Sequence, residues 1–254
     1  MRDGSRPTPS RSGAARADRR SPARAGSAAS GAPPPAGTDG LIVADGALEA
    51  LKWLAAGLMA MDHINRSLLG GAHAFLYDLG RLSMPVFGFV LMHHLARPGA
   101  CAAGVHRRVM ARLLGVGLLS TPVSAALAGA WPLNVLFMLL LSTAVVWLIE
   151  RRRRGLAALA FVVAGTAVEF WWFGVLACLG AWHYCRRPTA SRLALWALAL
   201  GALWLVNRNL AALAALPLVW CAARIDLPVV RCRWLFYGFY PAHLALIWGW
   251  QRVL

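Results

Sequence analysis

The sequence has few acidic residues and almost no lysine. It contains ten Asp and Glu against 26 Lys and Arg, and Lys52 is the only lysine. Charged residues make up 14% of the 254 residues, whereas about a quarter is usual in a soluble domain. Apolar residues make up 59%, and the net charge is nevertheless +16. This composition excludes an ordinary soluble enzyme and predicts an integral membrane protein.

Common cofactor and cysteine motifs are also missing. The chain has neither a P-loop nor a GxGxxG motif, and its five cysteines form no CxxC pair. We therefore expect free thiols and no disulfide framework. His183 and Cys185 are two apart on a predicted helix and point to different faces. We accordingly predict no metal site.

The N-terminal segment lacks both aromatic residues and an apolar run. Residues 1–40 contain seven Arg and three Asp among Pro, Ser, Ala and Gly. No apolar core precedes Leu48, so this segment is not a secretory signal. Without aromatic side chains to stack on bases, it does not indicate a specific nucleic-acid binder. We predict a disordered basic cytoplasmic tail over 1–45 that contacts membrane lipid, followed by a membrane domain over 46–254.

Long apolar runs fill the rest of the chain. A spanning helix needs about 20 apolar residues. The runs predict an all-α polytopic bundle of eight to ten transmembrane helices, with nine as the best count. The nine candidates are 48–65, 74–95, 109–128, 132–149, 155–169, 171–185, 191–206, 209–222 and 234–252.

The distribution of basic residues predicts the orientation of these spans. With the tail inside, 21 basic residues fall in cytoplasmic segments, and only Arg66, Arg81, Arg208 and Arg252 fall on the other side. Cytoplasmic loops of membrane proteins carry an excess of Lys and Arg. We therefore expect the N terminus inside and the C terminus outside, as in a multi-pass protein of the bacterial inner membrane.

A few ionisable and amide side chains interrupt the apolar spans. Such groups are costly in hydrocarbon, so each one is a functional candidate. The predicted topology places most of them near the outer face, which suggests a single polar cavity open to that side. Asp78 and Arg81 could instead form only an intrahelical ion pair, since they are three residues apart. The candidates are Asp62, His63, Arg81, Asn134, Glu169 and His243.

Four ordered motifs resemble those of the TraX family, and the resemblance covers essentially 48–254. Two further stretches, LARPG at 95–99 and VEFWW at 168–172, resemble its TrbP-like branch from conjugative elements. The four motifs are LKWL with MDHI in 51–64, GRLSMPVF at 80–87, LNVLF at 133–137 and FYGFYPAHL at 236–244.

The resemblance implies an inner-membrane acetyltransferase that modifies the N terminus of a conjugative pilin, with acetyl-CoA as donor. It implies that Asp62, His63, Arg81 and His243 are catalytic and that Arg81 and Asn134 contact the donor. The substrate-binding residues would be Glu169, Asn134 and Tyr240. In our hypothesis His63, helped by Asp62, accepts the proton of the amine. Arg81 and Asn134 would stabilise the oxyanion or a donor phosphate.

Two other functions remain open from the sequence. The same polar residues could line the path of a transporter or channel, although we see no inverted repeat between the halves of the chain. The chemistry could also be O-acetylation of an envelope glycan. His243 could serve as the base in place of His63.

Overall fold

The computed structural model describes residues 41–230 and 232–253. The tail predicted over 1–45 lies outside the described residues, except for its last five positions. Two of these five lie against the helical part: the Leu41 amide donates to the Cys185 carbonyl at 2.9 Å, and Val43 is buried. The last of them, Asp45, already begins the first helix.

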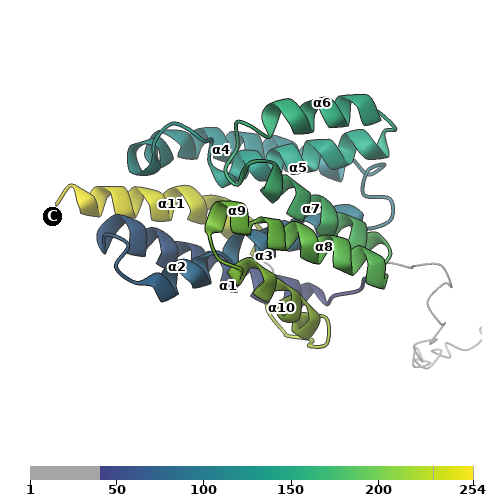
Figure 1. Ribbon diagram of the computed structural model, residues 1–254, viewed down its shortest axis with the longest axis horizontal. Helices are drawn as coiled ribbons and strands as arrows, with labels where there is room; N and C mark the ends of the chain where they lie inside the picture. The colour runs from purple at the N-terminus through teal and green to yellow at the C-terminus, as the bar shows by residue number, and fades with distance from the viewer. Residues whose placement is uncertain (1–40, 231, 254) are drawn as a thin grey trace, which may run out of the picture. The chain divides into compact units, whose positions relative to one another are not determined.

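Every regular element in the described residues is a helix, and one isolated bridge pairs Leu133 with Val168 (Figure 1). The elements are α1 Asp45–Leu68, α2 Ala74–Gly80, α3 Ser83–Ala96, α4 Val105–Ala128, α5 Val135–Glu150, α6 Arg154–Ala164, α7 Trp171–Arg186, α8 Ala190–Ala202, α9 Trp204–Asn207, the 3-10 helix η1 Ala211–Ala214, α10 Ala215–Ala222 and α11 Arg233–Gln251. The all-helical prediction is confirmed, and each predicted apolar run overlaps one or two of these helices.

The fifth run ends earlier than predicted. Its helix α6 stops at Ala164, so Glu169 lies in the loop before α7 rather than at a helix end. The backbone of this loop pairs with the segment before α5 instead of continuing the helix. The Leu133 amide donates to the Ala167 carbonyl, and the Glu169 amide donates to the Leu133 carbonyl, both at 2.8 Å.

Three helical segments are long and apolar enough to cross a membrane: Ala74–Ala96, Val105–Ala128 and Ala190–Asn207. Helices α5, α6 and the segment Ala211–Ala222 are apolar but shorter. Large apolar side chains on α4, α6 and α8 are exposed, among them Leu119, Leu159 and Leu198. So many exposed large apolar side chains suit a lipid environment. The chain is a membrane protein.

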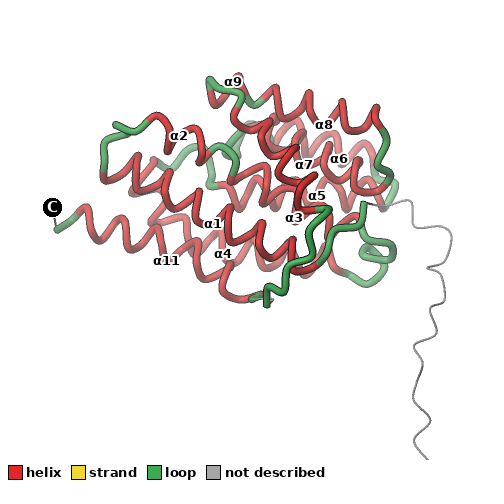
Figure 2. The backbone as a smooth tube through the Cα atoms, turned by 90° about the horizontal axis from the view of Figure 1, so that it is seen from below, coloured by secondary structure: helices red, strands yellow, loops and turns green. Residues whose placement is uncertain are grey.

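Helix α3 lies at the centre of the helical part, with ten of its 14 residues buried. It packs against α1 and α7 (Figure 2). Helix α5 packs on α7 and also contacts α3. Helix α11 packs on α1 and α4. A helix that is apolar on all sides is expected in a core position of this kind.

Successive helical segments run in alternate directions, so the loops gather at two ends. Contacts between distant loops define each end. Asp45 with Arg97, and Glu150 with Arg186, meet at one end, which we call the arginine end. The Ser67 carbonyl with Gln251, and Asp78 with Asn209, meet at the opposite end. The sequence predicted a set of basic residues in cytoplasmic loops. Those of them that the structure describes belong to the arginine end.

Candidate functional site

The two predicted catalytic histidines contact each other although 180 residues separate them. His63 Nδ1 and His243 Nε2 are 2.8 Å apart, and the two rings are nearly parallel. His63 comes from α1 and His243 from α11, which pack side by side. His243 is 7% exposed; its ring stacks on that of Phe239 and meets the Tyr240 ring edge-on.

The hydrogen bonds of this pair determine which nitrogen of each neutral ring carries the proton. His243 Nδ1 lies 2.9 Å from the Phe239 carbonyl, which can only accept. His243 Nδ1 therefore donates, and its Nε2 must accept from His63 Nδ1. The remaining nitrogen of His63, Nε2, is then left with a lone pair. His63 thus has the form of a base, and His243 is the residue that orients it.

Asp62 does not serve His63 in the way that the sequence hypothesis supposed. Its Oδ2 accepts from Arg66 at 2.6 Å and contacts Arg81, and no hydrogen bond joins it to His63 in the described part of the chain. Neighbouring residues on a helix diverge by about 100°. Asp62 therefore faces α2 and the start of α3, while His63 faces α11.

Arg81 occupies a fixed position at the junction of α2 and α3. Its guanidinium contacts Asp62 and lies over the Tyr77 ring at 4.4 Å. The alternative ion pair of Arg81 with Asp78 is not formed: Arg81 pairs with Asp62, and the Asp78 carboxylate accepts from Asn209 at 2.6 Å. Arg81 is 7% exposed, and among the described residues its Nε has no hydrogen-bond partner. This donor is therefore both buried and unpaired, while Arg81 as a residue lines the cavity described below.

Gly80 permits this arrangement. A Cβ added to Gly80 would lie 2.4 Å from the Asp62 Cβ, closer than any side chain could approach. Only glycine at this position lets α2 come close enough to α1 for Arg81 to reach the Asp62 carboxylate.

Asn134, predicted to contact donor and substrate, has a structural position. Its Oδ1 accepts from the Leu136 amide at 3.1 Å and so caps the N terminus of α5. Its Nδ2 donates to the Gly117 carbonyl of α4 at 3.3 Å. The side chain is buried between these two helices, and it is not among the residues that line the cavity described next.

A cavity of about 450 Å³ connects the candidate residues with the arginine end. At the opposite end its lining includes Asp62, His63, Arg81, Glu169 and Tyr240. Glu169 lies within electrostatic range of Arg66 and Arg81. The volume falls in the range of cavities that bind small molecules and cofactors.

The other part of the lining carries cations that were not among the predicted site residues. They are Lys52, Arg97, Arg108 and Arg112. Lys52 pairs with Glu49 at 2.5 Å and Arg97 with Asp45 at 2.5 Å. Arg108 donates to the Ala103 carbonyl at 2.8 Å, and in the described ranges it forms no ion pair with a carboxylate. In the sequence, these arginines were indistinguishable from ordinary determinants of topology.

Comparison with known proteins assigns the family. A family model described as TraX protein matches residues 47–251. The chain belongs to the TraX family. This family is associated with the processing of conjugative pilin. No curated protein and no solved structure matches this TraX chain.

Proposed function

We propose that this TraX chain is an inner-membrane acetyltransferase that moves acetyl from acetyl-CoA to the N-terminal amine of a conjugative pilin. One observation carries the proposal: His63, held by His243, lines a cavity that also contains arginines of the far end. Such a cavity offers a base for the amine at one end and cations for the donor phosphates at the other. Family membership supports the choice of pilin as acceptor.

In this proposal the nine apolar segments cross the membrane with the N terminus in the cytoplasm. The arginine end then faces the cytoplasm, as the excess of positive charge on that side favours. Acetyl-CoA is a cytoplasmic metabolite and would enter there. The His63–His243 pair lies toward the periplasm, where the N terminus of a mature pilin would be presented.

The phosphates of acetyl-CoA would bind Arg108 and Arg112, with Lys52 further along the cavity. Guanidinium groups suit phosphate because they donate several hydrogen bonds in one plane. Lys52 and His63 are 11 residues apart on α1, which is about 16 Å along the helix axis. An extended pantetheine arm can cover such a distance and bring the thioester to His63.

The transfer requires one base and one stabiliser of negative charge. His63 Nε2 removes a proton from the amine, whose nitrogen attacks the thioester carbonyl carbon. The guanidinium of Arg81, which lines the cavity, stabilises the oxyanion that forms. The carbon–sulfur bond then breaks, and CoA leaves as a thiolate that receives the proton from the His63 imidazolium. The products are the acetylated amine and CoA.

Glu169 and Tyr240 would position the acceptor. A carboxylate in the cavity attracts the protonated N terminus of a peptide, which releases one proton to water before the neutral amine reaches His63. The ring of Tyr240 lies edge-on to His243 at 5.5 Å between centroids and so shapes the wall beside the histidine pair. Asn134 has no direct part in this mechanism, because its amide is used between α4 and α5.

The proposal is tested by acetylation of a pilin-like peptide by the full chain in membrane vesicles supplied with labelled acetyl-CoA. We expect His63→Gln to lower the rate by about 10²- to 10⁴-fold, the usual contribution of a general base. His73→Gln is the matched control, because His73 is an exposed histidine outside the cavity.

Three outcomes would contradict the proposal. Wild-type rates in both His63→Gln and His243→Gln would exclude the histidine pair as the catalytic centre. Acetyl transfer to a cell-wall glycan but not to the peptide would show that the acceptor is a glycan and not a pilin. Proton-driven solute uptake in vesicles without acetyl-CoA, lost in His63→Gln, would identify a transporter instead.

A further inference from the structure

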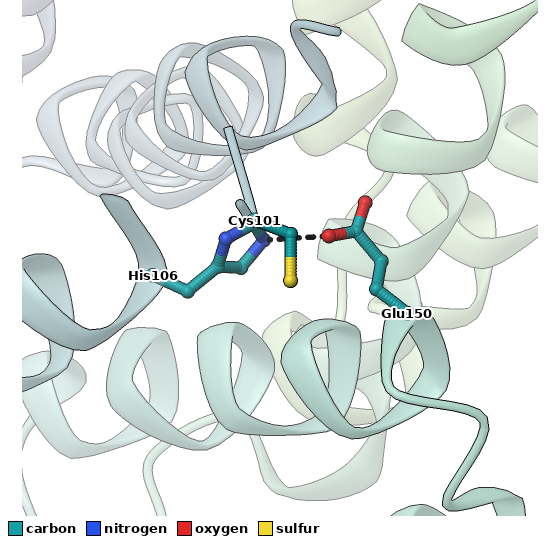
Figure 3. A group of neighbouring side chains, drawn as sticks. All are labelled: Cys101, His106 and Glu150. Atoms are coloured by element: carbon teal, nitrogen blue, oxygen red, sulfur yellow. Dashed lines mark ion pairs between the residues drawn. The ribbon is translucent and has the colours of Figure 1, made fainter. Parts of the chain in front are cut away.

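A second cluster of reactive side chains lies at the arginine end, outside the cavity. It contains Cys101 from the loop between α3 and α4, His106 from the first turn of α4, and Glu150 at the last position of α5 (Figure 3). The three side chains point toward one another, and each pair of their ligand atoms lies within 4.8 Å.

His106 is completely buried yet poorly satisfied. Its exposed fraction is 0%, and neither ring nitrogen has a hydrogen bond of good geometry to any described residue. A buried polar group without a partner is costly, so native structures rarely leave one without a reason. His106 Nε2 faces Glu150 Oε2 at 3.5 Å.

Glu150 divides its two oxygens between different neighbours. Its Oε1 accepts from Arg186 Nη1 at 3.2 Å. Its Oε2, which faces His106, is buried and accepts no hydrogen bond within the described ranges. One oxygen is therefore held by the ion pair with α7, and the other is available to a third partner. The ion pair and a ligand at Oε2 can coexist.

The distance between the histidine nitrogen and the carboxylate oxygen matches that around a tetrahedral zinc ion. Zinc binds histidine nitrogen and carboxylate oxygen at about 2.0–2.2 Å, so the nitrogen and oxygen ligands of one ion are roughly 3.3–3.5 Å apart. The separation of 3.5 Å between His106 Nε2 and Glu150 Oε2 is long for a hydrogen bond, but it agrees with the distance between two ligand atoms of one zinc ion. The Cys101 sulfur lies within 4.8 Å of both of these atoms, in a loop of short turns that can adjust to bring it to the ion.

We propose that Cys101, His106 and Glu150 bind one Zn²⁺ ion, with water in the fourth position. Mixed sulfur, nitrogen and oxygen ligands suit zinc, whereas calcium and magnesium prefer oxygen alone. Cys101 and Glu150 are only partly buried, so an ion can reach the site. The bound ion would tie the start of α4 and the loop before it to the end of α5. It would also satisfy His106.

The test is zinc binding by the full chain in detergent after removal of metal with a chelator. We expect about one Zn²⁺ per chain in a titration against a chromophoric chelator. Cys101→Ser and Glu150→Gln should each weaken binding at least about tenfold, since even changes around metal ligands cost that much. Cys221→Ser is the matched control, because Cys221 is an exposed thiol on α10.

A second readout does not depend on stability. Co²⁺ in place of Zn²⁺ should give a thiolate-to-metal charge-transfer band that disappears in Cys101→Ser and persists in Cys221→Ser. The proposal is overturned if the wild-type chain binds no zinc, or if Cys101→Ser and Glu150→Gln bind it as tightly as wild type. In that event the cluster is only an ion-pair network of His106, Glu150 and Arg186. None of these measurements depends on acetyl transfer.

Discussion

At the scale of single residues, the positions of the protons in the histidine pair distinguish the base from the residue that orients it. The sequence alone left open whether His63 or His243 is the base. The Phe239 carbonyl requires a proton on His243 Nδ1, and this leaves the lone pair on His63 Nε2. His63 is therefore the base in our mechanism, and His243 is a positioning residue.

This division predicts different outcomes for two substitutions of His243. His243→Gln keeps an acceptor for His63 Nδ1 and should retain much of the activity. His243→Leu removes the acceptor, frees the His63 ring to turn, and should lower kcat at least about tenfold, since orientation of a catalytic imidazole is worth at least this much. Peptide acetylation rates and their pH profiles check this. Equal rates in the two variants would show that His243 does not orient His63.

The sequence was sufficient to find the polar residues but not to pair them. Asp62, His63 and Arg81 stand out because ionisable groups are rare in apolar spans. The partner of Asp62 was not predictable, because it depends on the rotation of α1 and on the close approach of α2 at Gly80. Asn134 was assigned to ligand binding from the family motif, whereas its position at the start of α5 makes it a helix cap.

The proposed zinc site shows a similar limit. Cys101 and His106 are five residues apart, but Glu150 follows 44 residues later. No sequence spacing typical of metal sites joins the three. Only the packing of α4 on α5 brings them together.

At the scale of elements, the short helix α2 determines the geometry of the site. It packs on α1, and its last residue, Gly80, meets Asp62 directly. The apolar runs predicted these helices well because their length and composition are visible in the chain. The break between α2 and α3 at Arg81–Leu82 lies inside one apolar run and was not predicted.

Gly80→Ala should therefore separate α2 from α1. The added methyl group would meet the Asp62 side chain, and overpacking of this kind costs about 1–3 kcal/mol of stability. We expect a lower melting temperature in detergent and a loss of peptide acetylation. Gly57→Ala is the control, because no atom lies within 4 Å of its added Cβ and alanine favours the α1 helix. Equal stability of the two variants would contradict this role for Gly80.

At the scale of the whole helical part, a single cavity links groups from its two ends. Arg108 lies near the start of α4, and His63 lies toward the end of α1, yet both line it. The division of basic residues between the two ends follows from the sequence. The continuity of the cavity does not, because it depends on how the side chains of several helices fill the space between them.

Arg108→Gln should raise KM for acetyl-CoA about tenfold and leave kcat close to wild type. The reason is that Arg108 would contact the donor phosphates far from the reacting atoms, where a hydrogen bond to a charged group is worth about 1.5–3 kcal/mol. Steady-state kinetics check this, with Arg107→Gln as the control. Arg107 is the exposed neighbour of Arg108 and does not line the cavity. An equal rise in KM in both variants would indicate a general charge effect.

The most direct measurement of the central claim is acetyl transfer across a sealed membrane. The full chain is placed in liposomes with acetyl-CoA only in the lumen and the pilin-like peptide only outside, together with an enzyme outside that destroys leaked donor. A cavity that joins both ends predicts acetylated peptide outside, and none with His63→Gln. Acetylation only when donor and peptide share one compartment would contradict the account.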